Sequence, residues 1–144
     1  MLTIKNRELA PAIKLLNGME LKASDSRHRT KVLNLLNEAV KGLAEAELAL
    51  LKECAVLDSA GKPEISESGN VAMKPDLTPE KIVEYRTEHA KLFDEEVVID
   101  GGMYATNVAA FGKVLQEYDG VLSGELASIY DRLMDEYEKG KNNE

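Results

Sequence analysis

The feature that most constrains the fold of this chain is a line of apolar residues, three or four positions apart, between residues 33 and 57. Steps of three and four place such side chains on one face of a single helix. Ser24 is of a residue type that caps helix N-termini, so the pattern predicts one long helix over about residues 25–57. The line consists of Leu33, Leu36, Val40, Leu43, Ala46, Leu50, Cys54 and Leu57.

A helix of that length would measure about 50 Å at 1.5 Å per residue. A compact domain of 144 residues has a diameter below about 40 Å, so we expect an elongated molecule. The apolar stripe suits an intramolecular core and a homodimer equally well. The sequence therefore leaves a homo-oligomer open.

The other patterns predict a mainly α protein that is α+β by content. Thr78 and Pro79 form the strongest helix start, with Thr78 as the cap and Pro79 as the first residue. No internal repeat or linker is recognised, so residues 1–144 are expected to form a single domain with a polar tail from about residue 140. The expected elements are helices over about 7–17, 79–94, 103–118 and from 123 onward, a β-hairpin over about 62–74, and short strands at 2–4, 19–22 and 96–100, of which the first two are expected to pair.

Composition narrows the class of protein. The chain is 44% hydrophobic and 31% charged, which allows a buried core and disfavours global disorder. Cys54 is the single cysteine, so no intrachain disulfide can form, and with no signal peptide we expect a reducing cytoplasm. No apolar run approaches the roughly 20 residues that span a bilayer, so no membrane is expected.

Charge is distributed unevenly along the chain. The net charge is −8, but residues 1–31 carry seven basic residues against three acids, which gives +4 and leaves −12 for the remainder. The basic residues are Lys5, Arg7, Lys14, Lys22, Arg27, Arg29 and Lys31, and the acids are Glu8, Glu20 and Asp25. An acidic surface repels the phosphate backbone, so nucleic acid is an unfavoured partner.

The basic block at the start of the long helix is the first candidate binding site. It contains Arg27, His28, Arg29 and Lys31. Helix N-termini attract anions, so this block could hold a phosphate, a carboxylate cluster or a nucleic-acid backbone. The alternative is internal pairing with acids such as Glu95, Glu96 or Asp100, because surface charges usually contribute little.

The second candidate is the pair Gly101 and Gly102, followed by Tyr104. A Gly-Gly turn between a strand and a helix is where phosphate loops occur. This one lacks the Gly-Lys-Ser/Thr signature, and three carboxylates flank it. The pattern therefore favours a tight structural turn, or a loop that contacts a partner.

The residues give no catalytic constellation. His28 and His89 do not have the spacing of zinc ligands, and His89 lies on an apolar helical face. Cys54 lies on the apolar line, where a buried thiol is inert. We expect no enzyme activity, no metal and no cofactor.

Three segments together support a resemblance to a known family. They are residues 21–31, which include the basic block, residues 95–105, which include the Gly-Gly turn, and residues 118–125. The chain resembles a family of small, uncharacterised proteins, a domain of unknown function, encoded by phages and prophages of Gram-positive bacteria. The resemblance implies a gene in a late region near tail and lysis genes, and no catalytic residue can be carried over from it.

These observations lead to one main functional hypothesis. The chain is expected to be a non-catalytic phage accessory protein in the host cytoplasm that binds a host or phage protein, for example to inhibit a host defence factor or host enzyme. Its acidic helices would compete for a nucleic-acid-binding groove on that target. One alternative is a virion or tail-assembly component, and a further one is a nucleic-acid binder that uses the basic block.

Overall fold

The computed structural model describes residues 1–142 and confirms a mainly α protein with a small amount of β structure. The chain divides into two compact units. Unit 1 contains residues 1–40 and the chain from residue 96 onward, and unit 2 contains residues 41–95. Helix α2 (Ala23–Lys52) contributes to both units. The expected single domain over residues 1–144 stays a prediction.

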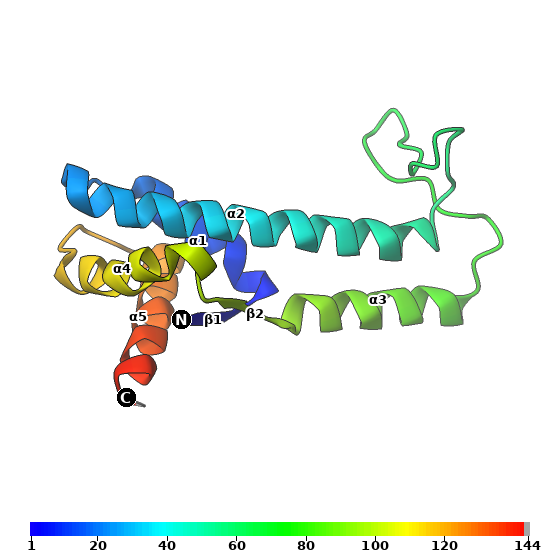
Figure 1. Cartoon of the computed structure of the whole chain (residues 1–144). Helices are drawn as coiled ribbons and strands as arrows, with labels where there is room; N and C mark the ends of the chain where they lie inside the picture. Colours follow the sequence, from blue (N-terminus) through cyan, green and yellow to red (C-terminus); the bar gives the residue numbers. More distant parts are fainter. Residues whose placement is uncertain (143–144) are drawn as a thin grey trace. The chain divides into compact units, whose positions relative to one another are not determined.

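In unit 1, a two-stranded antiparallel sheet pairs the N-terminus with a distant segment. Strand β1 (Leu2–Lys5) pairs with β2 (Glu96–Ile99) in the register Leu2 to Ile99 and Lys5 to Glu96. Figure 1 shows the two strands side by side. The strand expected at 96–100 is confirmed. The prediction that residues 19–22 form a strand and pair with β1 is wrong. Residues 19–22 form no strand, because Met19 turns its side chain into the core and its backbone N–H donates to Leu16 at the end of α1.

The core of unit 1 lies among β1 and four helices. The 3₁₀ helix η1 (Asn6–Glu8) leads into α1 (Leu9–Gly18), and η2 (Gly102–Tyr104) leads into α4 (Ala105–Glu117). Helix α5 (Gly124–Asn142) packs on α1 and α4. The polar tail expected from residue 140 is therefore still helical up to Asn142. The largest fully buried side chains are Leu2, Ile4, Leu9, Leu15, Leu16, Val32, Leu36, Val108, Phe111, Leu115 and Leu133.

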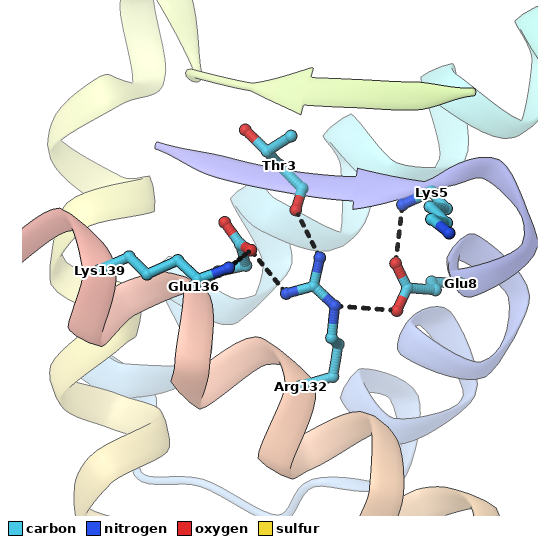
Figure 2. Close-up of polar contacts among 6 residues, drawn as sticks. All are labelled: Thr3, Lys5, Glu8, Arg132, Glu136 and Lys139. Atoms are coloured by element: carbon cyan, nitrogen blue, oxygen red, sulfur yellow. Dashed lines mark hydrogen bonds and ion pairs between the residues drawn. The ribbon is translucent and has the colours of Figure 1, made fainter. Parts of the chain in front are cut away.

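A cluster of polar contacts centred on Arg132 ties α5 to β1 and η1 (Figure 2). The Arg132 guanidinium lies 3.0 Å from a Glu8 carboxylate oxygen and 2.6 Å from one of Glu136, and it donates to the Thr3 carbonyl at 3.1 Å. Glu8 also accepts from the Lys5 backbone N–H at 2.7 Å, and Glu136 pairs with Lys139 at 3.1 Å. Burial alone would raise the pKa of Glu136, but hydrogen bonds from Arg132 and Lys139 outweigh it, so the pKa is lowered.

Unit 2 is built around two helical segments, which we call the arm: residues 41–52 of α2 and the whole of α3 (Pro79–Asp94). The predicted start of α3 is confirmed, since the Thr78 hydroxyl accepts from the Lys81 N–H and Pro79 is the first helical residue. Figure 1 shows the two segments side by side within this unit. His89 lies 3.5 Å from Glu47, between the rings of Tyr85 and Phe93.

The long helix ends at Lys52, five residues before the expected end at 57. Glu53 and Cys54 form a turn, and from Ala55 onward the backbone bonds to later residues instead of continuing the helix. The Val56 N–H donates to the Ala72 carbonyl at 2.8 Å. Ala72 donates to Glu64 at 2.9 Å, and Glu64 donates back to Val56 at 2.8 Å. These three bonds close a ring, and the three residues are evenly spaced at positions 56, 64 and 72.

The ring identifies a short internal repeat, which we call the cap (residues 54–74), where the sequence patterns had indicated none. Antiparallel bridges link Ala55 to Met73, Leu57 to Pro63, and Ile65 to Val71. The bridge between Ile65 and Val71 corresponds to the hairpin expected at 62–74. It is one of three similar bridges in the cap. The equivalent side chains Leu57, Ile65 and Met73 are 40%, 68% and 42% exposed.

A candidate protein-binding groove

The structure brings the two motifs predicted from sequence together in unit 1. The Lys31 ammonium lies 4.5 Å from the centre of the Tyr104 ring, a cation–π contact. His28 and Asn107 are hydrogen-bonded at 3.1 Å between their Nδ1 and Nδ2 atoms. The start of α2 is therefore held against the start of α4 by two polar contacts.

Arg29 has a structural place rather than a place on the surface. Its guanidinium donates to the carbonyls of Leu16 and Met19, both at 2.8 Å. These carbonyls lie at the C-terminal end of α1, where helix carbonyls lack intrahelical partners and carry partial negative charge. The basic block thus splits, with Arg29 capping α1 while the exposed Arg27 faces solvent. The expected pairing of the basic block with acids such as Glu95, Glu96 or Asp100 stays a prediction.

The Gly101–Gly102 segment is a tight turn. Both glycines have positive φ values, 88° and 50°, and the Asp100 carboxylate accepts the Gly102 N–H at 3.1 Å. A Cβ on Gly101 would lie 2.8 Å from the Val108 side chain and 2.9 Å from the Ala105 backbone. Only glycine combines this backbone conformation with so close an approach.

A groove of about 640 Å³ lies in unit 1. One wall is the segment between α1 and α2, and the other is the end of α4 with the segment that follows it. Four carboxylates line it against the single basic residue Lys22, and apolar side chains complete the lining. The carboxylates belong to Glu20, Asp25, Glu117 and Asp119, and the apolar and aromatic residues are Leu21, Val114, Tyr118 and Val121.

The lining combines charge with accessible apolar surface. Val121 is fully exposed, whereas Val114 is 5% exposed and belongs to the core beneath. Glu117 lies 4.0 Å from Lys113, an exposed pair that neutralises little of its charge. A second hollow of about 180 Å³ shares Asp25, Val114 and Glu117 with the groove and reaches His28. The groove therefore offers several carboxylates around an apolar strip, a lining that complements a segment bearing lysine or arginine beside apolar side chains.

The sequence analysis did not single out these residues as a site. Acidic residues in a strongly acidic chain are usually solvated surface, and sequence alone does not show that Glu20 and Asp119 share a groove. One available signal was residues 118–125, the third segment of the resemblance, which supplies Tyr118, Asp119 and Val121 to the lining.

The remaining titratable candidates lie elsewhere. Cys54 is 5% exposed, in agreement with its place on the apolar line. Among residues 1–142, no three His, Cys, Asp or Glu side chains are close enough together to hold a metal ion. None of the helices described is both long and apolar enough to cross a bilayer.

A family model described as a protein of unknown function (DUF1617) matches residues 1–144. The chain belongs to this family. Searches of curated proteins and of solved structures found no match. The match covers the whole chain, so the groove, the Arg132 cluster and the cap all lie inside the DUF1617 region.

Proposed function

We propose that this DUF1617 protein is a non-catalytic accessory protein, encoded by a phage or prophage, that acts by binding another protein through the acidic groove of unit 1. The observation that supports the proposal best is the lining of the groove, where four carboxylates surround accessible apolar side chains. Matched potentials steer encounter and fix the register of a complex, while the apolar strip contributes affinity.

The proposed partner carries a basic surface segment. Proteins that bind nucleic acid have such segments, because they must neutralise phosphate charge. An acidic groove that occupies one of them would block the host defence factor or host enzyme to which it belongs. The net charge of −8 acts in the same direction, since it attracts a basic partner over a longer range.

The test is affinity capture of the tagged chain from phage-infected bacteria, followed by quantitative mass spectrometry. The groove variant carries Glu117→Lys and Asp119→Lys. The control variant carries Glu64→Lys and Glu67→Lys, which change the net charge equally at exposed positions of the cap. We expect the same protein to be captured by the native chain and the control and to be lost from the groove variant.

Mass spectrometry of purified phage particles tests the alternative role as a virion or tail-assembly component. We expect the chain to be absent from particles at stoichiometric levels. Its stoichiometric presence there, with capture that is unaffected by the groove variant, would replace the proposal with a structural role in the particle.

A further inference from the structure

The arm of unit 2 lacks a buried core of its own along its length. None of the sixteen residues of α3 is buried, and none of residues 41–52 of α2 is. By contrast, the shorter α4 in unit 1 buries five residues. The buried residues of unit 2 are Cys54 and Ala55, at one end of the arm.

The arm nevertheless has the apolar side chains of a packed helix pair. Those on the sides that α2 and α3 turn toward each other are half-buried: Leu43, Ala46 and Leu50 on α2, and Ile82, Tyr85, Leu92 and Phe93 on α3. Helices in proteins obtain most of their stability from burying an apolar face against other elements. A two-helix arm offers each helix one neighbour, which leaves a second apolar face uncovered.

That second face can be located from the helical repeat. On α2, Ala44, Leu48 and Leu51 follow steps of four and three, about 100° around the helix from the line through Leu43 and Leu50. On α3, Val83 and Ala90 are seven positions apart. Each follows a residue of the line through Ile82 and His89 by one position, so it also lies about 100° around its helix from that line. Because the two helices run in opposite directions, equal turns bring both sets to the same side of the arm. We call this side the arm face.

The arm face is accessible. Leu48 is 39% exposed and Val83 is 61% exposed, and Ala44 and Ala90 are exposed as well. Clustered exposed apolar side chains of this kind mark interaction surfaces.

Charge identifies what covers this face. The two helical segments of the arm carry five basic residues against six acids, a net of −1, although the whole chain carries −8. The basic residues are Lys41, Lys52, Lys81, Arg86 and Lys91, and the acids are Glu45, Glu47, Glu80, Glu84, Glu88 and Asp94. The arm is therefore a nearly neutral part of an acidic molecule, where two copies can meet with little repulsion.

One end of the arm also carries complementary charges. Lys52 is the last residue of α2, and Glu80 lies at the start of α3. A twofold axis parallel to the helices places α2 of one copy over α3 of the other, which brings Lys52 of each copy near Glu80 of the other. We propose that the arm face is a homodimer interface of this arrangement, formed by two copies of the chain.

The size of the face sets the expected affinity. A 16-residue helix is about 24 Å long, and two adjacent helices about 10 Å wide present on the order of 500 Å² per copy. Standard stable interfaces bury about 800 Å² per partner, so we expect a micromolar dissociation constant.

Sedimentation velocity of the purified full chain, from about 1 to about 200 µM, tests the proposal in the range set by that affinity. The variants Leu48→Glu and Val83→Glu each put a carboxylate on the arm face at an already exposed position, and circular dichroism checks that the helices are retained. Met103→Glu is the control, because Met103 is 86% exposed in unit 1 and lines neither the groove nor the arm face.

We expect the native chain and the control to shift from monomer to dimer within this range, and both arm variants to stay monomeric. A native chain that is monomeric throughout would overturn the proposal. A dimer that persists in both variants would also overturn it, since the interface would then lie elsewhere. Both results are obtained without a partner protein, so they are independent of the proposed function of the groove.

Discussion

Replacing Arg132 with alanine tests whether the polar cluster of Figure 2 holds unit 1 together. The Arg132 side chain is 30% exposed, whereas Glu8 and Glu136 are 19% and 11% exposed. The substitution leaves two largely buried carboxylates without their guanidinium and the Thr3 carbonyl without its donor. It breaks interactions that tie α5 to β1 and η1, two consecutive elements at the opposite end of the chain.

The expected magnitude follows from these three contacts. A hydrogen bond to a charged group contributes about 1.5–3 kcal/mol, and loss of one partner from a buried ion pair costs about 3–5 kcal/mol. Glu8 keeps the Lys5 N–H and Glu136 keeps Lys139, and the guanidinium is partly open to water, so the cost is reduced. We expect a loss of about 3 kcal/mol for Arg132→Ala and about 1–2 kcal/mol for Arg132→Lys, since lysine cannot bind three acceptors in a fixed fork.

The assay is urea denaturation followed by circular dichroism, with thermal melts in parallel. A loss of about 3 kcal/mol corresponds to a fall in Tm of about 6–12 °C for a domain of this size. Lys139→Ala is the control, because Lys139 is 67% exposed and its removal should cost about 0.5 kcal/mol or less. A loss for Arg132→Ala below about 1 kcal/mol, or equal to that of the control, would refute the argument that burial makes this cluster strong.

The same cluster predicts a pH dependence. The pKa of Glu136 is lowered from its ordinary 4.5, so the unfolded state binds more protons than the native state as the pH falls toward and below that value. The stabilisation is present above pH 4.5 and is lost as the pH falls through the native pKa. We expect Arg132→Ala to show a weaker loss of stability between neutral and acidic pH than the native chain, and parallel losses in the two proteins would contradict this.

Three further predictions concern single positions in unit 1. Arg29→Ala should destabilise the chain by about 2–3 kcal/mol in urea denaturation, because the Leu16 and Met19 carbonyls lose a charged donor. Surface substitutions scatter within about 0.5 kcal/mol, so a loss of stability no larger than that would exclude the capping role. Gly112→Ala should also destabilise the chain, by about 1–3 kcal/mol, because the new Cβ would lie 2.5 Å from the Tyr137 ring. A gain in Tm would show instead that this ring can move aside. Burial raises the pKa of Tyr137 above its usual 10, so its stabilising effect is complete below pH 10 and is lost as the pH rises through the native pKa. An alkaline absorbance titration should therefore show a tyrosine that ionises only as the protein unfolds, and in Tyr137→Phe that late phase should disappear.

Local patterns predicted the helices well because the signals are local. Thr78 and Pro79 start α3 as expected, and the Gly101–Gly102 turn precedes η2 and α4. The line of apolar residues also predicted α2, but not which of its residues are buried. Val32, outside the line, is 1% exposed, whereas Leu57, on the line, is 40% exposed, because the chain leaves the helix before reaching it.

Features that depend on distant parts of the chain could not be predicted in the same way. The short apolar run within residues 96–100 predicts a strand, but it does not identify the strand that pairs with it, so Leu2 and Ile99 could not be recognised as partners. The role of Arg29 depends on where α1 ends in space. The cap is an intermediate case, since its spacing of 56, 64 and 72 is present in the sequence but becomes significant only with the ring of hydrogen bonds.

The central claim is that the acidic groove of unit 1 binds a basic segment of a partner protein. Isothermal titration calorimetry with the purified partner, once captured, measures this directly for the native chain, the Glu117→Lys and Asp119→Lys groove variant, and the Glu64→Lys and Glu67→Lys control. Like charges placed against a basic segment cost several kcal/mol, so the groove variant should bind at least about a hundredfold more weakly, while the control stays within about threefold of the native chain. Equal affinities for the groove variant and the control would show that net charge, and not this groove, is what the partner recognises.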